Sequence, residues 1–238
     1  MNDNLKLKNF PKIYYINLDR HITRNEKMES MFLNLKHQRI SGVDGNLFLD
    51  DKDYIKKTYN MNVYEMGCTM SHLKAINTYL NDTSNNDAWA IISEDDISFE
   101  FVEYWDLNFE DYIKKLPSDW EIFQMMSLHF KDVNQEKLFK IEKKFYYSTA
   151  FYLIKRESAK KIVDTYFSEK YIKEKTNCYL ADTLIYKSVK TYTIYPSLIM
   201  SKSNETSIIG NKSAMDHKLK NQEQSYLSQK KMWMENLK

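Results

Sequence analysis

The feature that most constrains this chain is an apolar segment that ends in three consecutive acids. Residues 88–93 read Ala-Trp-Ala-Ile-Ile-Ser, and Glu94, Asp95 and Asp96 follow directly. A short apolar run of this kind predicts a strand buried inside a sheet. The acids then lie at the carboxyl end of the strand, which is where ligands bind in open α/β sheets. The segment therefore predicts an α/β domain whose binding site includes this strand end.

The acidic triplet itself indicates a metal site. Three adjacent carboxylates repel one another unless a cation lies among them. Hard oxygen ligands favour Mn or Mg over zinc, and we expect Asp96 and Glu94 to be the metal ligands. The alternative is a solvated acidic turn, which is the commoner explanation of a bare acidic triplet. The buried run in front of the triplet favours the metal site.

Composition excludes several classes of function. The 238 residues, 42% hydrophobic and 14% aromatic, are enough for a real core. A net charge of only +2 gives no global field that would recruit nucleic acid. No segment approaches the roughly 20 apolar residues of a membrane helix, and the first residues are polar and lysine-rich, so we expect a cytoplasmic protein without a membrane span. Four glycines leave no glycine-rich phosphate loop, which argues against kinases, GTPases and dinucleotide-dependent dehydrogenases. The oligomeric state stays open.

The rest of the chain alternates strand and helix patterns, which predicts an α/β fold with a mostly parallel sheet. We expect one domain over residues 1–210 and a polar, helical C-terminal tail over residues 211–238. Strands are predicted at 12–18, 38–43, 88–93, 120–126, 146–154 and 191–195, and helices at 21–33, 51–59 (a helix or lid), 65–80, 101–116, 157–166, 181–189 and 217–237. Cys68 and Cys178 are too few and too distant for a disulfide framework or a cysteine-based zinc site, and Cys68 is expected to be a small core residue.

Two of the four arginines, Arg20 and Arg24, follow the first predicted strand. In a chain that otherwise uses lysine, arginine suggests a need for a rigid bidentate donor. The strand also leads into a helix N-terminus, which favours anions. A diphosphate is the natural ligand for such a site. A pair of surface arginines one helical turn apart explains the local pattern equally well.

Polar residues near two predicted helix starts are further candidates. Residues 65–72 read Glu-Met-Gly-Cys-Thr-Met-Ser-His, and Gly67 would let a ligand approach the backbone closely. Ser71 and His72 could reach a bound group, although a lone histidine is more often packed or solvated. Asp182 opens another helix, where capping explains it as well as a catalytic role does. The chain has no G-x-S-x-G motif, which argues against a serine hydrolase.

Taken in order, these segments resemble glycosyltransferase family 25, the lipopolysaccharide-biosynthesis and procollagen galactosyltransferase group. The resemblance covers residues from about 13 to about 208. It is carried by residues 16–20 with Arg24, 43–45, Glu65 with Gly67, Cys68, Ser71 and His72, 94–96, 117–121, 149–154, 181–182 and 195–196. The chain departs from the family at Tyr64, where a glycine is usual, and in the loosely fitting segment 200–207.

The resemblance implies a GT-A fold, a nucleotide-sugar donor (often UDP-galactose), Mn as the usual metal, and transfer with inversion. It places Glu94, Asp95 and Asp96 in the role of the D-x-D motif. The residues implied on the donor side are Asn17, Arg20, Arg24, Asp44, Gly45 and Ser71. Asp182 matches a carboxylate near the acceptor and is the first candidate for the catalytic base, followed by Glu65 and His72.

The chain is thus predicted to be a metal-dependent inverting glycosyltransferase that moves a sugar, galactose as a first guess, to a hydroxyl of a glycan or protein. A bacterial or viral glycan pathway fits better than collagen modification. The alternative is a catalytically weak module that binds a nucleotide sugar or glycan on the same fold. A metal-dependent phosphodiesterase or nuclease would need a second His- and Asp-rich cluster, for which five scattered histidines give little support.

Overall fold

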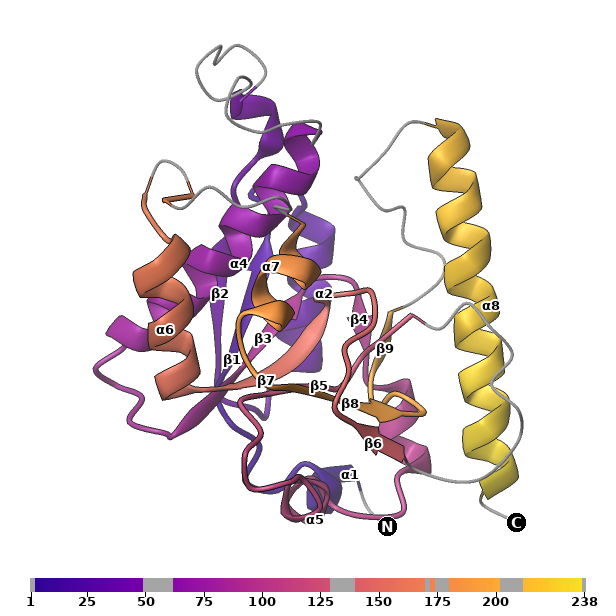
Figure 1. The fold of residues 1–238 in the computed structure, drawn as a ribbon. Helices are drawn as coiled ribbons and strands as arrows, with labels where there is room; N and C mark the ends of the chain where they lie inside the picture. The colour runs from indigo at the N-terminus through magenta and orange to yellow at the C-terminus, as the bar shows by residue number, and fades with distance from the viewer. Residues whose placement is uncertain are drawn as a thin grey trace.

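The structure is a computed structural model that describes residues 3–48, 62–128, 140–169, 172–173, 180–201 and 212–236. Within these residues, seven strands form one sheet in the order β2-β1-β3-β7-β5-β8-β6 (Figure 1). Their bounds are β1 Ile13–Asn17, β2 His37–Ser41, β3 Trp89–Glu94, β5 Ile122–Gln124, β6 Lys140–Glu142, β7 Phe151–Lys155 and β8 Thr191–Tyr195. The short strands β4 (Ile97–Ser98) and β9 (Met200–Ser201) pair separately.

Strand direction confirms the predicted α/β class. In the described sheet, β1 is parallel to β2 and β3, and β5 is parallel to β8. Strand β7 is antiparallel to both β3 and β5, so the group β1, β2 and β3 runs in the same direction as the pair β5 and β8. Strand β6 is antiparallel to β8. Five of the seven described strands therefore run the same way, as predicted for a mostly parallel sheet.

Helices cover both faces of the sheet. The described helices are α1 Asp3–Lys6, α2 Ile22–Met31, η1 Gly45–Phe48, α4 Val63–Asn81, η2 Glu100–Tyr104, α5 Phe109–Lys114, α6 Arg156–Tyr166, α7 Ala181–Lys187 and α8 Lys212–Asn236. Helices α4, α6 and α7 supply one hydrophobic core, whereas α2, η2, α5 and α8 supply the other. No helix in the described ranges is both long and apolar enough to cross a membrane.

Side chains of the central strands alternate between the two cores. In β1, Ile13 and Tyr15 point into one core, and Tyr14 and Ile16 point into the other. Every residue of β1 is buried. A strand that is covered on both faces reads as a continuous apolar run rather than as an alternating one. The same rule applies to β3 and explains why the apolar segment at 88–93 predicted that strand so clearly.

Helix α4 starts with a capping box and passes close to η1. Asn62 accepts from the backbone N–H of Glu65, and Glu65 Oε2 accepts from the Asn62 N–H at 3.3 Å. Gly67 is the fifth residue of this helix, and a Cβ added there would lie 2.8 Å from both Gly45 N and the Val43 carbonyl oxygen. The expectation that Gly67 leaves room for a ligand was wrong, because its missing side chain lets two backbone segments meet.

The predicted C-terminal helix is present as α8, which packs against η2 and β9 (Figure 1). Trp233 is buried, and its Nε1–H donates to the Ser197 carbonyl at 3.0 Å. Gln229 is also buried; its Oε1 accepts from Ser197 N–H at 2.6 Å, and its Nε2 donates to the Ser127 carbonyl at 3.1 Å. These contacts attach α8 to the loops that follow β5 and β8.

Two predicted elements differ from the structure. The helix expected over 101–116 is broken into η2 and α5, because Trp105 turns inward to donate to the Leu198 carbonyl and Asn108 caps the new helix. The strand expected over 146–154 begins only at Phe151. Before it, the carbonyls of Tyr146 and Ser148 accept from the side chain of Gln124 on β5 rather than from the backbone of a neighbouring strand. The predicted segment at 51–59, Cys178 and most of the loosely fitting segment at 200–207 lie outside the described residues.

Candidate active site

The predicted site residues gather at the carboxyl ends of β1 and β3, next to the first turns of α4. Strand β3 ends at Glu94, and Asp95 and Asp96 form the turn that leads to β4. Two pockets meet here. Their linings have three residues in common, namely Cys68, Glu94 and Asp96. The carboxylates predicted from the acidic triplet therefore lie at a junction rather than at the end of a single cleft.

Asp95 is held by two neighbouring side chains, one on each carboxylate oxygen. Asn17 Nδ2 donates to Asp95 Oδ2 at 2.7 Å, and Arg24 donates to Asp95 Oδ1 at 2.8 Å. Arg39 in turn donates to Asn17 Oδ1 at 2.9 Å. Both side chains of the ion pair are largely buried, with 16% of Arg24 and 10% of Asp95 exposed. Asp95 thus fixes the position of Arg24 along the first pocket.

The first pocket has a basic rim. Arg20, His21 and Arg24 line it together with Gly45. Arg20 also forms an ion pair with Asp44, and both side chains of this pair are partly exposed. Burial and the neighbouring charge of Arg24 lower the pKa of His21, so the cationic form of this imidazole is disfavoured. The two arginines are therefore the cationic side chains of the rim. Each already pairs with a carboxylate, Arg20 with Asp44 and Arg24 with Asp95, so an anionic group of a ligand would compete with these acids for them.

His72 and Thr149 hold the carboxylate of Glu94. The His72 Nε2–H donates to Glu94 Oε1 at 3.2 Å, and the Thr149 hydroxyl donates to the same oxygen at 3.0 Å. Tyr152 hydrogen-bonds the other ring nitrogen of His72 at 3.3 Å. Burial acts to raise the pKa of Glu94, but these hydrogen bonds and the charges of His72 and Arg24 outweigh it, so the net pKa lies below the usual value. Glu94 is therefore held as a carboxylate.

The second pocket contains Asp182. This residue lies in the first turn of α7, and its Oδ1 accepts from the backbone N–H of Thr183 at 2.6 Å. The hydrogen bonds recorded for Asp182 within the described chain all end on Oδ1. Ser148, Thr149 and the α8 side chains Asn221 and Gln222 line the same pocket. A carboxylate oxygen thus faces a cleft edged by hydroxyl and amide groups.

Two other predicted residues have clear structural roles. Glu65 lines the second pocket but also completes the capping box of α4. The Ser71 hydroxyl donates to the Gly67 carbonyl at 2.6 Å and accepts from Val43 N–H at 2.8 Å, which ties α4 to the loop after β2. Catalysis by Glu65 and donor binding by Ser71 stay predictions.

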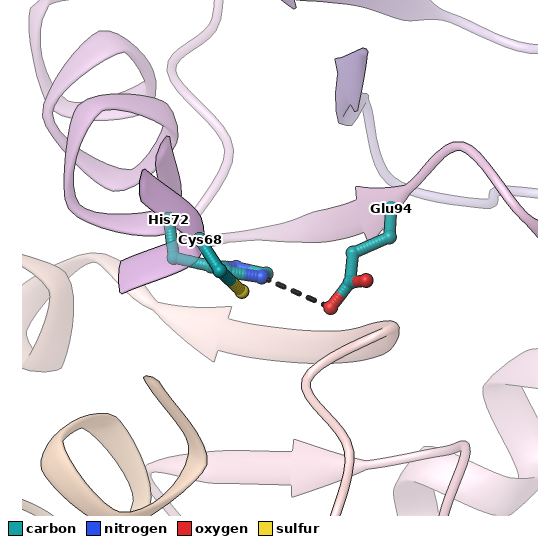
Figure 2. Close-up of side chains that lie close together, drawn as sticks. All are labelled: Cys68, His72 and Glu94. Atoms are coloured by element: carbon teal, nitrogen blue, oxygen red, sulfur yellow. Dashed lines mark hydrogen bonds and ion pairs between the residues drawn. The ribbon is translucent and has the colours of Figure 1, made fainter. Parts of the chain in front are cut away.

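Cys68 is the site residue that the sequence reasoning missed. As expected it packs against a hydrophobic core, but it lies at the edge of that core, lines both pockets at their junction and is partly exposed. Figure 2 shows its sulfur beside the His72 ring, with Glu94 opposite. Burial and the negative charges of Glu94 and Asp182 raise the pKa of the Cys68 thiol well above its usual value. The spacing of Cys68 and His72, four residues apart on a predicted helix, was the signal that could have revealed it.

An α/β domain with carboxylates at the end of a central strand, and a basic pocket beside them, is compatible with the GT-A-like fold of glycosyltransferases. Comparison with known families gives the more specific result. Residues 10–185 match the family model of glycosyltransferase family 25 (LPS biosynthesis protein). The chain belongs to this family and is a glycosyltransferase, which implies a sugar donor and an acceptor. None of the curated proteins compared with the chain matches it.

Proposed function

We propose that this glycosyltransferase takes its sugar from a nucleotide-sugar donor in the first pocket and transfers it to an acceptor hydroxyl in the second. The observation that carries the proposal is the junction itself: Glu94 and Asp96 line both pockets. A transferase must bring the donor sugar and the acceptor hydroxyl together at one point, with charge stabilisation on the leaving-group side and a base on the other. The arginines lie on one side of the junction, and Asp182 lies on the other.

The basic rim favours the first pocket as the donor side. The leaving group of a nucleotide sugar is a nucleoside diphosphate, which gains negative charge as the glycosidic bond breaks. Arg24 is held by Asp95, so its position is fixed before the ligand arrives. Arg20 is more exposed, with 39% of its side chain accessible, and would exchange its ion pair with Asp44 for a phosphate contact.

The chemistry of the donor atoms fits a divalent metal at the junction. Glu94 and Asp96 offer carboxylate oxygens, which are the ligands that Mn and Mg prefer. Both carboxylate oxygens of Asp95 accept hydrogen bonds, from Asn17 and Arg24, whereas His72 and Thr149 both bond Oε1 of Glu94, so Glu94 and Asp96 are the proposed ligands. When bound there, the metal would act as a Lewis acid that neutralises charge on the diphosphate.

Asp182 is the proposed base. Direct transfer with inversion needs a proton acceptor on the face of the sugar opposite the leaving group. Asp182 is in the pocket opposite the arginines, and its recorded hydrogen bonds leave Oδ2 for an acceptor hydroxyl. His72 is less suited, because only 1% of its side chain is exposed and it is hydrogen-bonded to Glu94 and Tyr152. It acts by positioning Glu94.

The decisive experiment compares Asp96→Asn with Asp164→Asn, an exposed acid on α6. A thermal-shift screen with and without Mn first identifies the donor, with UDP-galactose as the first candidate, because a bound ligand stabilises the folded state. Mn-dependent release of nucleoside diphosphate is then measured, and circular dichroism monitors the fold. We expect Asp96→Asn to lose this turnover while remaining folded, and Asp164→Asn to keep it.

Wild-type turnover in folded Asp96→Asn would contradict the metal assignment. Donor binding by the wild-type chain with no turnover, even with a panel of glycan and hydroxylysine acceptors, would instead identify a binding module on the same fold.

A further inference from the structure

Beyond the proposed reaction, we propose that Cys68, His72 and Glu94 form a binding site for a zinc-like divalent transition-metal ion. This site differs in chemistry from the all-oxygen site at Asp96, although Glu94 belongs to both. Cys68 and His72 lie one helical turn apart on α4, and Glu94 ends β3. One ligand atom from each residue, a sulfur, a nitrogen and an oxygen, lies within 4.8 Å of the other two (Figure 2).

The separations are close to those that a tetrahedral ion requires. Zinc bond lengths of about 2.0–2.3 Å place neighbouring ligand atoms about 3.3–3.8 Å apart. His72 Nε2 and Glu94 Oε1 are already 3.2 Å apart. The Cys68 sulfur is therefore the atom that must move toward the other two ligand atoms. It lies within 4.8 Å of both, so it has at most about 1.5 Å to move before it reaches a tetrahedral separation. Rotation of one cysteine side chain on a fixed helix is on this scale.

The ligand set selects a softer ion than Mn or Mg. Thiolate and imidazole ligands favour zinc and related transition metals, whereas hard ions prefer oxygen alone. Three protein ligands leave the fourth position of a tetrahedron open, as in catalytic zinc sites. Cys68 and Glu94 line both pockets, so the ion has a path from solvent and its open position faces the cleft.

Neighbouring residues already orient the ligands. Tyr152 is fully buried and meets His72 Nδ1 at 3.3 Å. If Nε2 binds a metal, Nδ1 carries the proton, and the Nδ1–H group donates a hydrogen bond to the Tyr152 oxygen. Metal-binding histidines usually make an outer hydrogen bond of this kind. Thr149 donates to the Glu94 carboxylate at 3.0 Å and fixes its direction. Two of the three ligands thus have supporting hydrogen bonds in place.

Charge balance favours a bound cation. Without a metal, a neutral Cys68 thiol beside the Glu94 carboxylate leaves the cluster with one negative charge. A bound divalent ion deprotonates a coordinating thiol outright. The ion, one thiolate and one carboxylate then sum to zero charge, and the histidine ligand is neutral. Binding of the ion with loss of the thiol proton therefore removes one negative charge from a cleft that Asp96 and Asp182 also line.

The test uses Co²⁺ alone as a coloured substitute for Zn²⁺, so its outcome does not depend on sugar transfer. A cobalt–thiolate bond gives a near-ultraviolet charge-transfer band, which is titrated in the wild type, in Cys68→Ser and in Cys178→Ser. Cys178→Ser is the matched control, because it removes the other cysteine of the chain. Zn²⁺ affinity is measured in parallel by competition with a coloured chelator, and circular dichroism monitors folding.

We expect one equivalent of Co²⁺ to give the band in the wild type and in Cys178→Ser, and Zn²⁺ to abolish it. Cys68→Ser should lose the band and bind Zn²⁺ at least about tenfold more weakly, since losing even an outer-shell partner costs about 10–100-fold. If Cys68→Ser does not fold, His72→Gln supplies the same affinity comparison, because it removes a ligand of this site and leaves both proposed ligands of the all-oxygen site in place. No band in the wild type, or an unchanged band in Cys68→Ser, would overturn the site.

Discussion

The ion pair between Arg24 and Asp95 yields a prediction whose size follows from its burial. Arg24→Gln removes the charged donor 2.8 Å from Asp95 Oδ1 and leaves a carboxylate that is only 10% exposed. Loss of a hydrogen bond to a charged group costs about 1.5–3 kcal/mol, and unpairing a fully buried charge costs about 3–5 kcal/mol. Because Asn17 still donates to Asp95 at 2.7 Å, we expect the free energy of unfolding to fall by about 2–3 kcal/mol.

The matched control is Lys160→Gln on α6. Lys160 and Asp164 form an ion pair at 2.5 Å, but their side chains are 69% and 61% exposed. A solvent-exposed pair of this kind contributes about 0.3–0.5 kcal/mol. Urea unfolding of both variants, followed by circular dichroism without ligand, compares a largely buried pair with an exposed one in the same protein. Equal m-values would show that the change is in stability alone.

A double-mutant cycle completes the experiment. Asp95→Asn removes the charge that Arg24 pairs with, so Arg24→Gln combined with Asp95→Asn should cost less than the sum of the single changes. We expect a coupling energy of about 1–2 kcal/mol. If Arg24→Gln costs no more than Lys160→Gln, or if the two changes at the site are additive, the pair does not hold the strand end and Arg24 is not positioned by Asp95.

Three other outcomes follow. Gly67→Ala should destabilise the protein by about 1–3 kcal/mol in urea unfolding, because the added Cβ would lie 2.8 Å from Gly45 N. Wild-type stability of the variant would show that α4 and the segment at Gly45 separate easily. Asp182→Asn should keep UDP binding in calorimetry but lose transfer to an acceptor hydroxyl, whereas near-normal transfer would leave it a helix-start residue. The hydrogen bonds from Lys12, Ser84 and Tyr14 lower the pKa of Asp82, so the stability that this carboxylate contributes should be complete well above pH 4 and lost as the pH falls further. Asp82→Asn should therefore make the stability of the protein less dependent on pH during acid unfolding. An unchanged acid transition would exclude this contribution.

Strand positions were predictable where burial alone decides structure. The segment at 191–195 was predicted residue for residue, because all five side chains of β8 are buried. The helix expected over 101–116 failed because its break depends on distant partners. Trp105 is drawn inward by the Leu198 carbonyl, which is 93 residues away in the sequence. Helical periodicity carries no information about such a contact.

The candidate site divides in the same way. The position of the acids at the end of a buried strand followed from the apolar run, and β3 ends at Glu94, one residue beyond the predicted Ser93. The contacts of Asp95 and Ser71 could not be predicted, because their partners are distant in the sequence. Asp95 accepts hydrogen bonds from residues of β1 and α2, and the Ser71 hydroxyl accepts one from the loop after β2. The place of Cys68 at the junction of the pockets was missed for the same reason. A cysteine on a mostly buried helix face looks like a core residue until the opposing strand end is known.

The attachment of α8 has a consequence for the shape of the second pocket. The family match ends at residue 185, yet Asn221 and Gln222 form part of the wall of the second pocket. Trp233 and Gln229, further along the same helix, hold it to the domain. Gln222 also donates to the Ser201 hydroxyl of β9, so one residue of the pocket wall is itself a point of attachment. The shape of the second pocket and the seating of α8 are therefore coupled through Gln222, while Gln229 and Trp233 hold the helix about two and three turns further on.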